Sequence, residues 1–525
     1  MKTSNRNYNY YNLSKINNLR DLLELQLDRN PNSIAFSYKE NDILVKKTFI
    51  EVNNDINNLS SYFYKKYKNK HIALIGENSY NWIITFLSII LSGNVCVVMD
   101  KDLNEKDLNK LLKTSNTKVI YYSAKYCQFI DDMKVDSYQI EDIYKYIEKG
   151  KKYNNKYEID DYKDAALFFT SGTTGANKCV VLSQKNMAYD IYAAASLYKP
   201  SGNVVSVLPF HHAFGLVTSV LKPIYYGKEV FINSSLKYMM NDFKEFKPDT
   251  LFVVPAFIET FYRQIWKKAR KNNQDKKLKY TIRLSNRLLK LGIDIRKKLF
   301  KNILDEFGGN ISYIICGGAY LDSKYVKWFR SIGIEILNGY GITECSPVVS
   351  VNRNHFYKDG SIGQVCRGID IKIINNEICV KGPIVMKGYY KDKKSTSKVI
   401  IDNYFHTGDL GYIDKDGFLF ITGRKKNIII LNNGENISPE EIESDLLKDD
   451  AVQEVVVYSK NNKLIAYIYP NEEYIGNKQY FDNLIYGYNK NKSKSHQISE
   501  VELRIKEFIK NNNGKIMRNK INEGE

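Results

Sequence analysis

The chain has 525 residues, of which 43% are hydrophobic and 26% are charged. This length predicts two or more domains, and the composition excludes a disordered chain and a chain that lies mainly within a membrane. The 7 cysteines include no C-x-x-C pair, which argues against a disulfide framework and a zinc site. The formal net charge of +19 could attract anionic partners, but lysine is abundant along the whole chain. A general compositional bias is the simpler explanation, so we expect no nucleic-acid partner.

Two segments bear on the location of the protein. Residues 1–15 lack the apolar stretch of a secretory signal and are rich in Asn and Tyr, which predicts a loose tail. The most apolar stretch, 82–99, is interrupted by Thr, Ser, Gly and Asn, so it predicts a helix, a turn and a buried strand rather than a membrane span. We therefore expect a cytoplasmic protein, with a peripheral position at the inner membrane surface as the alternative.

The first recognisable unit covers residues 71–100. It contains a short apolar strand, a helix that follows Ser79, a glycine turn and a second strand, which is the pattern of a βαβ unit. Apolar segments of the same kind recur at 204–208, 250–254, 313–315 and 334–337. The sequence therefore predicts an α/β fold in which largely parallel sheets are covered by helices.

Residues 263–301 form a strongly basic stretch with Leu and Ile at helical spacing, and its acids are Asp275 and Asp294. A solvated pair of helices is the expected identity. The alternative is a surface that binds a membrane or a partner, because basic amphipathic helices can lie on anionic lipid.

The pattern changes after Gly360, where short strands alternate with Gly and Asn turns and predict a small β-rich subdomain. Farther on, Ser438, Pro439 and Glu441 predict the start of a helix, with the serine as N-cap and the glutamate closing a capping box. This helix would belong to a separate, small α+β unit at the C-terminus.

The strongest chemical signal is the segment FFTSGTTGANK at 168–178, where an apolar strand leads into hydroxyls, glycines and a lysine. Gly172 and Gly175 would let the backbone turn its N–H groups toward an anion, and Lys178 would add a positive charge. The spacing excludes a Walker-type phosphate loop. The segment predicts a phosphate-binding loop, and a flexible polar turn is the alternative.

This loop resembles the phosphate loop of the adenylate-forming, or AMP-binding, superfamily of acyl-CoA synthetases, luciferases and peptide-synthetase adenylation domains. Further segments match in the same order along the chain: LPFHHAFG at 208–215 beside the carboxylate, NGYGITE at 338–344 for adenine and magnesium, YFHTGD at 404–409 for ribose, GRKKN with NGENISPEEIE within 423–443 for ribose and the hinge, and NGKI at 513–516 for the catalytic lysine. The resemblance implies an enzyme that converts a carboxylic acid and ATP, with Mg²⁺, into an acyl-adenylate and pyrophosphate. It then implies transfer of the acyl group to CoA.

The same resemblance implies the domains and the site. A large N-terminal domain of parallel α/β subdomains and a small β-rich subdomain, 1–423, would bind ATP and the acid, and a small mobile α+β domain, 424–525, would act as a lid. Catalytic roles fall on Lys515, Thr343, Glu344 and His212, with Glu344 also the metal ligand. Cofactor-binding roles fall on Thr170, Ser171, Gly172, Thr173, Thr174, Gly175, Lys178, Gly317, Gly318, Ala319, Tyr340, Asp409, Arg424, Lys426 and Gly434.

Some of these roles have a physical rationale of their own. Glu344 near nucleotide phosphates needs a hard cation such as Mg²⁺ between the charges. Asp409 can accept hydrogen bonds from ribose hydroxyls, and Tyr340 can stack on adenine. The adjacent His211 and His212 are expected to point in different directions without a third metal ligand. By analogy with the family, His212 would instead gate the site of the acyl carboxylate.

The chain also departs from the family pattern. Asn177 and Cys179 stand where the phosphate loop commonly has proline and glycine, and the lysine motif lacks its preceding proline and threonine. No aspartate that could hold a substrate ammonium group occurs in PFHHAFG, which favours an uncharged acyl tail. The 263–301 stretch, the segment FGGNISYIICGGAYLD at 307–322 and the long form of the loop NNGENISPEEIE at 432–443 resemble bacterial long-chain fatty acyl-CoA synthetases.

Alternatives remain open at this point. The acid could be alkyl or aryl, and the acceptor could be the phosphopantetheine of an acidic carrier protein attracted by the basic chain. A nucleotide- or acyl-binding protein without catalysis is a further alternative, although the joint presence of the five candidate polar residues Lys178, Glu344, Asp409, Arg424 and Lys515 argues against it.

Overall fold

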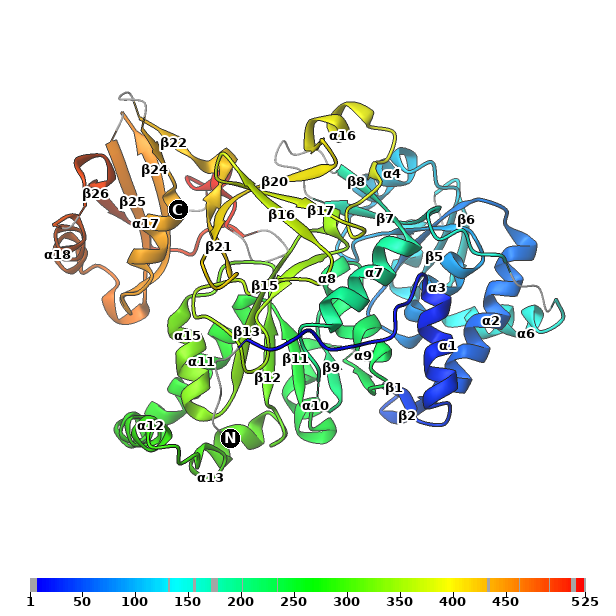
Figure 1. Cartoon of the computed structure of the whole chain (residues 1–525), viewed down its shortest axis with the longest axis horizontal. Coiled ribbons are helices and arrows are strands. Elements are labelled where there is room, and N and C mark those ends of the chain that lie inside the picture. Colours follow the sequence, from blue (N-terminus) through cyan, green and yellow to red (C-terminus); the bar gives the residue numbers. More distant parts are fainter. Residues whose placement is uncertain are drawn as a thin grey trace.

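The architecture is that of a computed structural model of the chain (Figure 1). It describes residues 7–130, 133–153, 157–170, 178–200, 202–233, 235–431, 435–461, 463–490, 492–510 and 516–523. Two large sheets, a small β-rich subdomain and a C-terminal α+β unit make up the molecule (Figure 1). No helix within these ranges is both long and apolar enough to cross a membrane.

The first large sheet has seven strands in the order β18-β8-β7-β4-β3-β5-β6. The pairs from β7 to β6 are parallel, whereas β8 pairs antiparallel with both β7 and β18. The strands are β3 (His71–Ile75), β4 (Val95–Val98), β5 (Val119–Tyr122), β6 (Asp136–Gln139), β7 (Asp164–Thr170), β8 (Lys178–Ser183) and β18 (Gly388–Tyr389). The βαβ unit predicted at 71–100 is confirmed: β3 and β4 flank α3 (Tyr80–Leu91), and the side chain of Ser79 accepts a hydrogen bond from the N–H of Trp82.

The second large sheet has nine strands in the order β15-β14-β13-β12-β11-β9-β10-β1-β2. Its pairs from β13 to β1 are parallel and its edges are antiparallel. The strands are β1 (Ile34–Glu40), β2 (Ile43–Thr48), β9 (Val204–Ser206), β10 (Val230–Ile232), β11 (Thr250–Val253), β12 (Tyr313–Cys316), β13 (Glu335–Gly341), β14 (Val348–Val351) and β15 (Gln364–Val365). The four apolar segments predicted as strands are therefore β9, β11, β12 and β13 of one sheet.

Helices lie between and around the two large sheets (Figure 1). Helix α7 (Gln184–Ala195) contacts β7 and β8 of the first sheet and β14 of the second, so its buried face belongs to the core that joins them. Beside it run α8 (Ala213–Leu216), a π-helical turn (Val217–Leu221) and α9 (Lys222–Tyr225). The remaining helices of this half are α1 (Leu19–Arg29), α2 (Phe49–Lys66), α4 (Glu105–Thr114), α5 (Cys127–Ile130), α6 (Ile143–Gly150) and α10 (Met239–Phe246).

The basic stretch is helical, as predicted. It forms most of α11 (Pro255–Lys271) and all of α12 (Asp275–Lys290) and α13 (Arg296–Leu299), which lead into α14 (Lys301–Glu306). Helices α11 and α12 pack against each other and against α15 (Ser323–Ile332). The exposed face of this pair is mixed, since basic residues alternate with Tyr280 and Leu284.

The β-rich subdomain is an antiparallel sheet in the order β16-β17-β20-β19, with β21 also paired to β20. Its elements are β16 (Asp370–Ile374), β17 (Glu377–Lys381), α16 (Lys393–Val399), β19 (Ile400–Ile401), β20 (Tyr404–Ile413) and β21 (Leu419–Arg424). The C-terminal unit has its own apolar core. It contains β22 (Ile429–Ile430), β23 (Asn436–Ile437), α17 (Pro439–Leu446), β24 (Val452–Lys460), β25 (Lys463–Pro470), α18 (Lys478–Asn489) and β26 (Ile498–Leu503).

The start of α17 corrects one detail of the sequence analysis. Ser438 precedes the helix and Pro439 is its first residue, as expected, but the serine side chain makes no cap hydrogen bond to the described backbone of α17. Its Oγ donates instead to the backbone carbonyl of Thr422 at 2.7 Å. The capping-box prediction with Glu441 is therefore wrong, because a carbonyl at the end of the β-rich subdomain binds the hydroxyl.

Candidate active site

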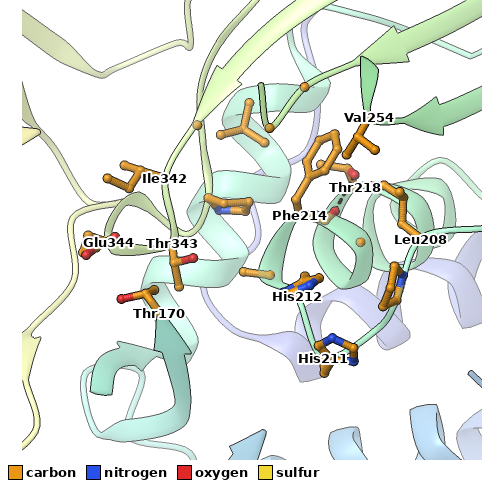
Figure 2. Close-up of a pocket in the computed structure, with 18 of the residues that line it drawn as sticks. Thr170, Leu208, His211, His212, Phe214, Thr218, Val254, Ile342, Thr343 and Glu344 are labelled. Atoms are coloured by element: carbon orange, nitrogen blue, oxygen red, sulfur yellow. Dashed lines mark hydrogen bonds between the residues drawn. The ribbon is translucent and has the colours of Figure 1, made fainter. Parts of the chain in front are cut away.

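A cavity of about 1600 Å³ lies where the carboxyl ends of parallel strands from both large sheets meet the β-rich subdomain. Ligand sites in open α/β sheets commonly occur at such strand ends. Figure 2 shows Thr170, Thr343 and Glu344 at one side of the cavity and Phe214, Thr218 and Val254 at the other, with His211 and His212 below Phe214. The predicted site residues among its lining are Thr170, Lys178, His212, Gly317, Gly318, Tyr340, Thr343, Glu344 and Arg424.

The remaining predicted residues fall into two groups. Asp409, Ala319 and Lys426 are not among the described residues that line the cavity. Lys426 is exposed in the turn directly after β21. The others lie outside the described residues: Ser171, Gly172, Thr173, Thr174, Gly175, Gly434 and Lys515.

Glu344 is a buried acidic group at this end of the cavity. It lies in the short turn that joins β13 to β14 and is 7% exposed. Its Oε1 accepts a hydrogen bond from the hydroxyl of Tyr389 at 2.9 Å, and the Nζ of Lys178 lies 4.6 Å from the centroid of the Tyr389 ring. Burial raises the pKa of Glu344, whereas the Tyr389 hydroxyl, Lys178 and Arg424 oppose that rise.

The donor chemistry here fits Mg²⁺. The carboxylate of Glu344 and the hydroxyls of Thr170 and Thr343 are oxygen donors on one side of the cavity (Figure 2). Oxygen ligands suit this cation, which also keeps several water molecules and contacts the phosphates of its substrate. A cation at this position would offset the cost of burying the Glu344 charge.

Asp409 lies behind the cavity wall rather than on it. Its Oδ2 accepts from the hydroxyl of Tyr340 at 2.6 Å, and its Oδ1 pairs with the Nε of Arg424 at 2.7 Å. The register of β20 with β21 places Asp409 directly opposite Arg424. A carboxylate oxygen has two acceptor positions, so Asp409 can still accept from a sugar hydroxyl while it orients Tyr340 and Arg424.

The two histidines stand at the start of the α8 segment. Their ring centroids are 4.3 Å apart, and the ring planes are tilted by 59° to each other. The Nε2 of His211 lies 3.2 Å from the Oδ1 of Asp100. Burial, followed by the neighbouring His212, lowers the pKa of His211 despite the Asp100 charge. The neutral form of the His211 ring is therefore favoured beside Asp100.

One grouping of potential metal ligands in the described part of the chain lies elsewhere on the wall, at Glu377, Cys379 and His406. The Oε2 of Glu377 is already 2.9 Å from the Nζ of Lys425, and its Oε1 accepts from the N–H of Gly408 at 2.9 Å. This grouping is an ion-paired network that joins β17, β20 and the turn after β21.

Beyond the histidines the cavity becomes an apolar arm. Its walls come from apolar side chains in or just after strands of the second large sheet, together with Phe214 on the helical segment. These strand residues are Leu208, Val254, Ile315, Val348 and Val351. Gly317 leaves room for that segment, since a Cβ there would lie 3.0 Å from the ring of Phe214. Gly318 has a φ of +87°, a conformation that favours glycine.

Two residues at the cavity were missed from the sequence. Tyr389 gives no local signal, because it reaches Glu344 through long-range contacts: the pairing of β18 with β8 and the hydrogen bond from the N–H of Met386 to the carbonyl of Glu344. Lys222 did carry a signal, as a lysine within an otherwise apolar helical segment, but no motif drew attention to it.

Curated relatives resemble the chain at modest identity. It is 28% identical over 312 residues to the long-chain-fatty-acid–CoA ligase FadD15 of Mycobacterium bovis, a match that covers 56% of this chain and 52% of the relative. It is 26% identical over 508 residues to the long-chain-fatty-acid–[acyl-carrier-protein] ligase AEE15 of Arabidopsis thaliana, covering 77% and 69%. The match therefore spans about half the length of FadD15.

Solved structures share the fold over nearly the whole chain. The anthranilate CoA ligase AuaEII, in complex with anthranoyl-AMP, superposes with a TM-score of 0.79 at 17% identity and covers 99% of this chain and 98% of its own. The o-succinylbenzoate CoA synthetase of Bacillus subtilis, in complex with its acyl-adenylate, gives 0.74 at 21% identity, with 96% and 98% covered. The predicted α/β fold is thus confirmed.

The motifs quoted from the sequence and the model of the family agree. The family model described as AMP-binding enzyme matches residues 23–390, which include the β7–β8 hairpin, the histidine pair, Glu344 and Tyr389. The chain belongs to the AMP-binding enzyme family.

Proposed function

We propose that the protein is an AMP-forming acid–thiol ligase that activates a fatty acid with ATP and Mg²⁺ and transfers the acyl group to CoA. The observation that carries the proposal is one continuous cavity with two chemically different ends. Lys178, Glu344 and Arg424 line the polar end, and apolar side chains line the arm beyond His212. Such a cavity suits a triphosphate at one end and an acyl chain at the other.

In the first half-reaction a carboxylate oxygen of the acid forms a bond to the α-phosphorus of ATP as the bond from that phosphorus to the bridging oxygen breaks and pyrophosphate leaves. Lys178 and the 170–175 loop would hold the phosphates, and Thr343 and Lys515 would donate to the oxygens on which charge develops. Glu344 would hold Mg²⁺, which supplies charge neutralisation between the phosphates. His212 would line the entry of the carboxylate.

The nucleoside end is assigned to the group around β20 and β21. Tyr340 would face adenine, the Asp409–Arg424 pair would bind ribose, and Gly317, Gly318 and Ala319 would border the nucleotide. In the second half-reaction the thiol sulfur attacks the acyl carbon and AMP leaves. We place a hinge at Lys426 and a domain boundary between 423 and 424, so that 424–525 removes Lys515 and brings Gly434 to the thiol path.

A carrier protein is the second candidate acceptor. One relative, AEE15, is named as an acyl-carrier-protein ligase, and the chain has a formal net charge of +19. Carrier proteins are acidic, so a basic surface would speed their encounter.

Contact with a membrane surface is a separate proposal. The α11–α12 pair combines basic residues with the exposed side chains of Tyr280, Leu284 and Leu291. Basic amphipathic helices bind anionic lipid in this way. Co-sedimentation with anionic but not neutral vesicles would support it, and equal recovery with both would reject it.

Pyrophosphate release tests the main proposal. The enzyme is assayed with ATP and Mg²⁺ across fatty acids of graded length, an aryl acid and amino acids, with CoA, with a phosphopantetheinylated carrier protein and with neither. Acyl-CoA formation supports the first acceptor, and acyl transfer only to the carrier protein supports the second. Absence of pyrophosphate release across the whole panel rejects the ligase.

A further inference from the structure

The helical segment that begins beside the histidines leads away from the polar end of the cavity. Phe214, Thr218 and Lys222 follow one another at intervals of four residues and all line the cavity, so they form one face of the segment. Lys222 comes ten positions after His212 along this segment, which at α-helical spacing is a rise on the order of 15 Å. Lys222 therefore lies deep in the apolar arm, far from the site of adenylation.

Lys222 is an enclosed cation without a partner in the described part of the chain. The residue is 3% exposed, and its Nζ lies 5.2 Å from the ring of Tyr198 and 5.4 Å from the ring of Phe252. The Nζ of Lys222 thus lies over two aromatic rings, and no hydrogen bond or ion pair joins Lys222 to a described residue. Burial lowers the pKa of Lys222 to about 8, with Cys366 and Asp190 acting in the opposite direction.

Asp190 is the nearby acid, and it is engaged elsewhere. It is fully buried on α7, and its Oδ1 accepts from the N–H of Val348 at 2.9 Å. Its Oδ2 has no partner among the described residues, so no ion pair with Lys222 forms. Burial raises the pKa of Asp190 well above its ordinary value, which favours the neutral acid. A positive charge at neutral pH is left at the end of the arm.

A buried cation without a counter-ion is costly, and a cavity that ends on one is shaped for an anion. Resting on the proposed ligase function, we propose that Lys222 binds a second carboxylate at the far end of the substrate. The preferred acid is then an α,ω-dicarboxylic acid with an apolar body. PFHHAFG offers no aspartate for a substrate ammonium group, and the proposal replaces the uncharged acyl tail expected from that motif with a tail that ends in an anion.

The test compares acids of equal length that end in a methyl, a hydroxyl or a carboxylate group. Pyrophosphate release by the whole enzyme gives kcat/KM for each. We expect the ω-carboxylate to be favoured over the methyl terminus by about 100-fold, because the methyl terminus leaves the ammonium unpaired. A preference for the methyl terminus, or for the hydroxyl over the carboxylate, would overturn the proposal.

Lys222→Met supplies the variant, since Met is apolar and of similar length. This variant should lower the ratio of kcat/KM for the ω-carboxylate acid to kcat/KM for the methyl acid by about 100-fold, mainly because kcat/KM for the dicarboxylic acid falls. Lys237→Met removes the same charge from an exposed position on the chain that follows the cavity-lining Leu236, and its ratio should stay that of the wild type. An unchanged ratio in Lys222→Met would show that the lysine does not bind the substrate terminus.

Two further measurements separate the remaining outcomes. If Lys222 only stabilises Asp190, then Asp190→Asn and Lys222→Met lower the melting temperature alike and neither changes the ratio, which contradicts the proposal. If Lys222→Met does not fold, the wild-type ratio is followed with pH. It should fall as the pH rises through about 8, where Lys222 loses its proton, and a flat ratio contradicts the proposal. Absence of turnover with every acid would instead reject the ligase function.

Discussion

Replacing Tyr389 by Phe tests how Glu344 is held for its proposed role. The change removes the hydroxyl that donates to Glu344 Oε1 at 2.9 Å and keeps the ring that lies 4.6 Å from Lys178 Nζ. A hydrogen bond to an ionised group contributes about 1.5–3 kcal/mol. Since about 1.4 kcal/mol is a tenfold change in an equilibrium constant, we expect the apparent affinity for Mg²⁺ to fall by about tenfold to 100-fold.

The same substitution should move the pH profile in a defined direction. Burial already raises the pKa of Glu344, and the Tyr389 hydroxyl opposes that rise. Without the donor the pKa rises further, so the carboxylate takes up its proton at a higher pH. Activity that is lost as the pH falls through this pKa will then be lost earlier, and the acid limb of kcat/KM will shift to higher pH.

The assay is pyrophosphate release at fixed ATP with varied Mg²⁺, repeated across the acid range. Tyr390→Phe is the matched control, because it removes a hydroxyl from the adjacent residue, whose ring packs 5.1 Å from His71. That variant should keep both the Mg²⁺ dependence and the pH profile. If Tyr389→Phe also keeps both, Tyr389 does not position Glu344 and the reasoning is refuted.

Three other substitutions give distinct outcomes. Glu344→Gln should abolish adenylation yet stabilise the ligand-free protein by about 1 kcal/mol at neutral pH. The reason is that a buried acid with a raised pKa destabilises the fold once the pH rises above the pKa of that acid in the unfolded chain. Thermal melts at two pH values check the sign. Lys515→Ala should abolish pyrophosphate release and spare ATP binding, and release near the wild-type rate would contradict its catalytic role. Arg424→Lys should raise the KM for ATP about tenfold with little change in melting temperature, since lysine lacks the planar fork that now pairs with Asp409; an unchanged KM would remove Arg424 from the nucleotide site.

Much of the fold follows from local patterns in the sequence. The strand–helix–strand order at 71–100 is encoded by an apolar run, the Ser79 cap and a glycine turn, all within one unit of chain. The strands β9, β11, β12 and β13 are similarly short, apolar and bounded by turns. These features act over a few residues, so they can be read without knowing which strands become neighbours.

What could not be predicted depends on segments that meet only in the folded chain. The hydroxyl of Ser438 donates to the carbonyl of Thr422 because the end of β21 lies against the start of α17. A local pattern that predicts a helix cap cannot show that a distant carbonyl competes for the same hydroxyl. Asp409 is held by Tyr340, which comes from a different sheet. That Lys222 has no hydrogen-bond or ion-pair partner among the described residues is likewise a property of the surrounding helices and strands.

The two-residue strand β18 has a consequence for how the cavity can change over evolution. Gly388 and Tyr389 pair with Val181 and Val180, so the two ends of the long segment between β8 and β18 lie side by side in one sheet. The helical face with Phe214, Thr218 and Lys222 belongs to that intervening segment. Insertions or substitutions on that helical face can reshape the arm that would bind the acid, while Lys178, Tyr389 and Glu344 keep their spacing. Substrate range and phosphoryl chemistry are thereby free to diverge independently within one cavity.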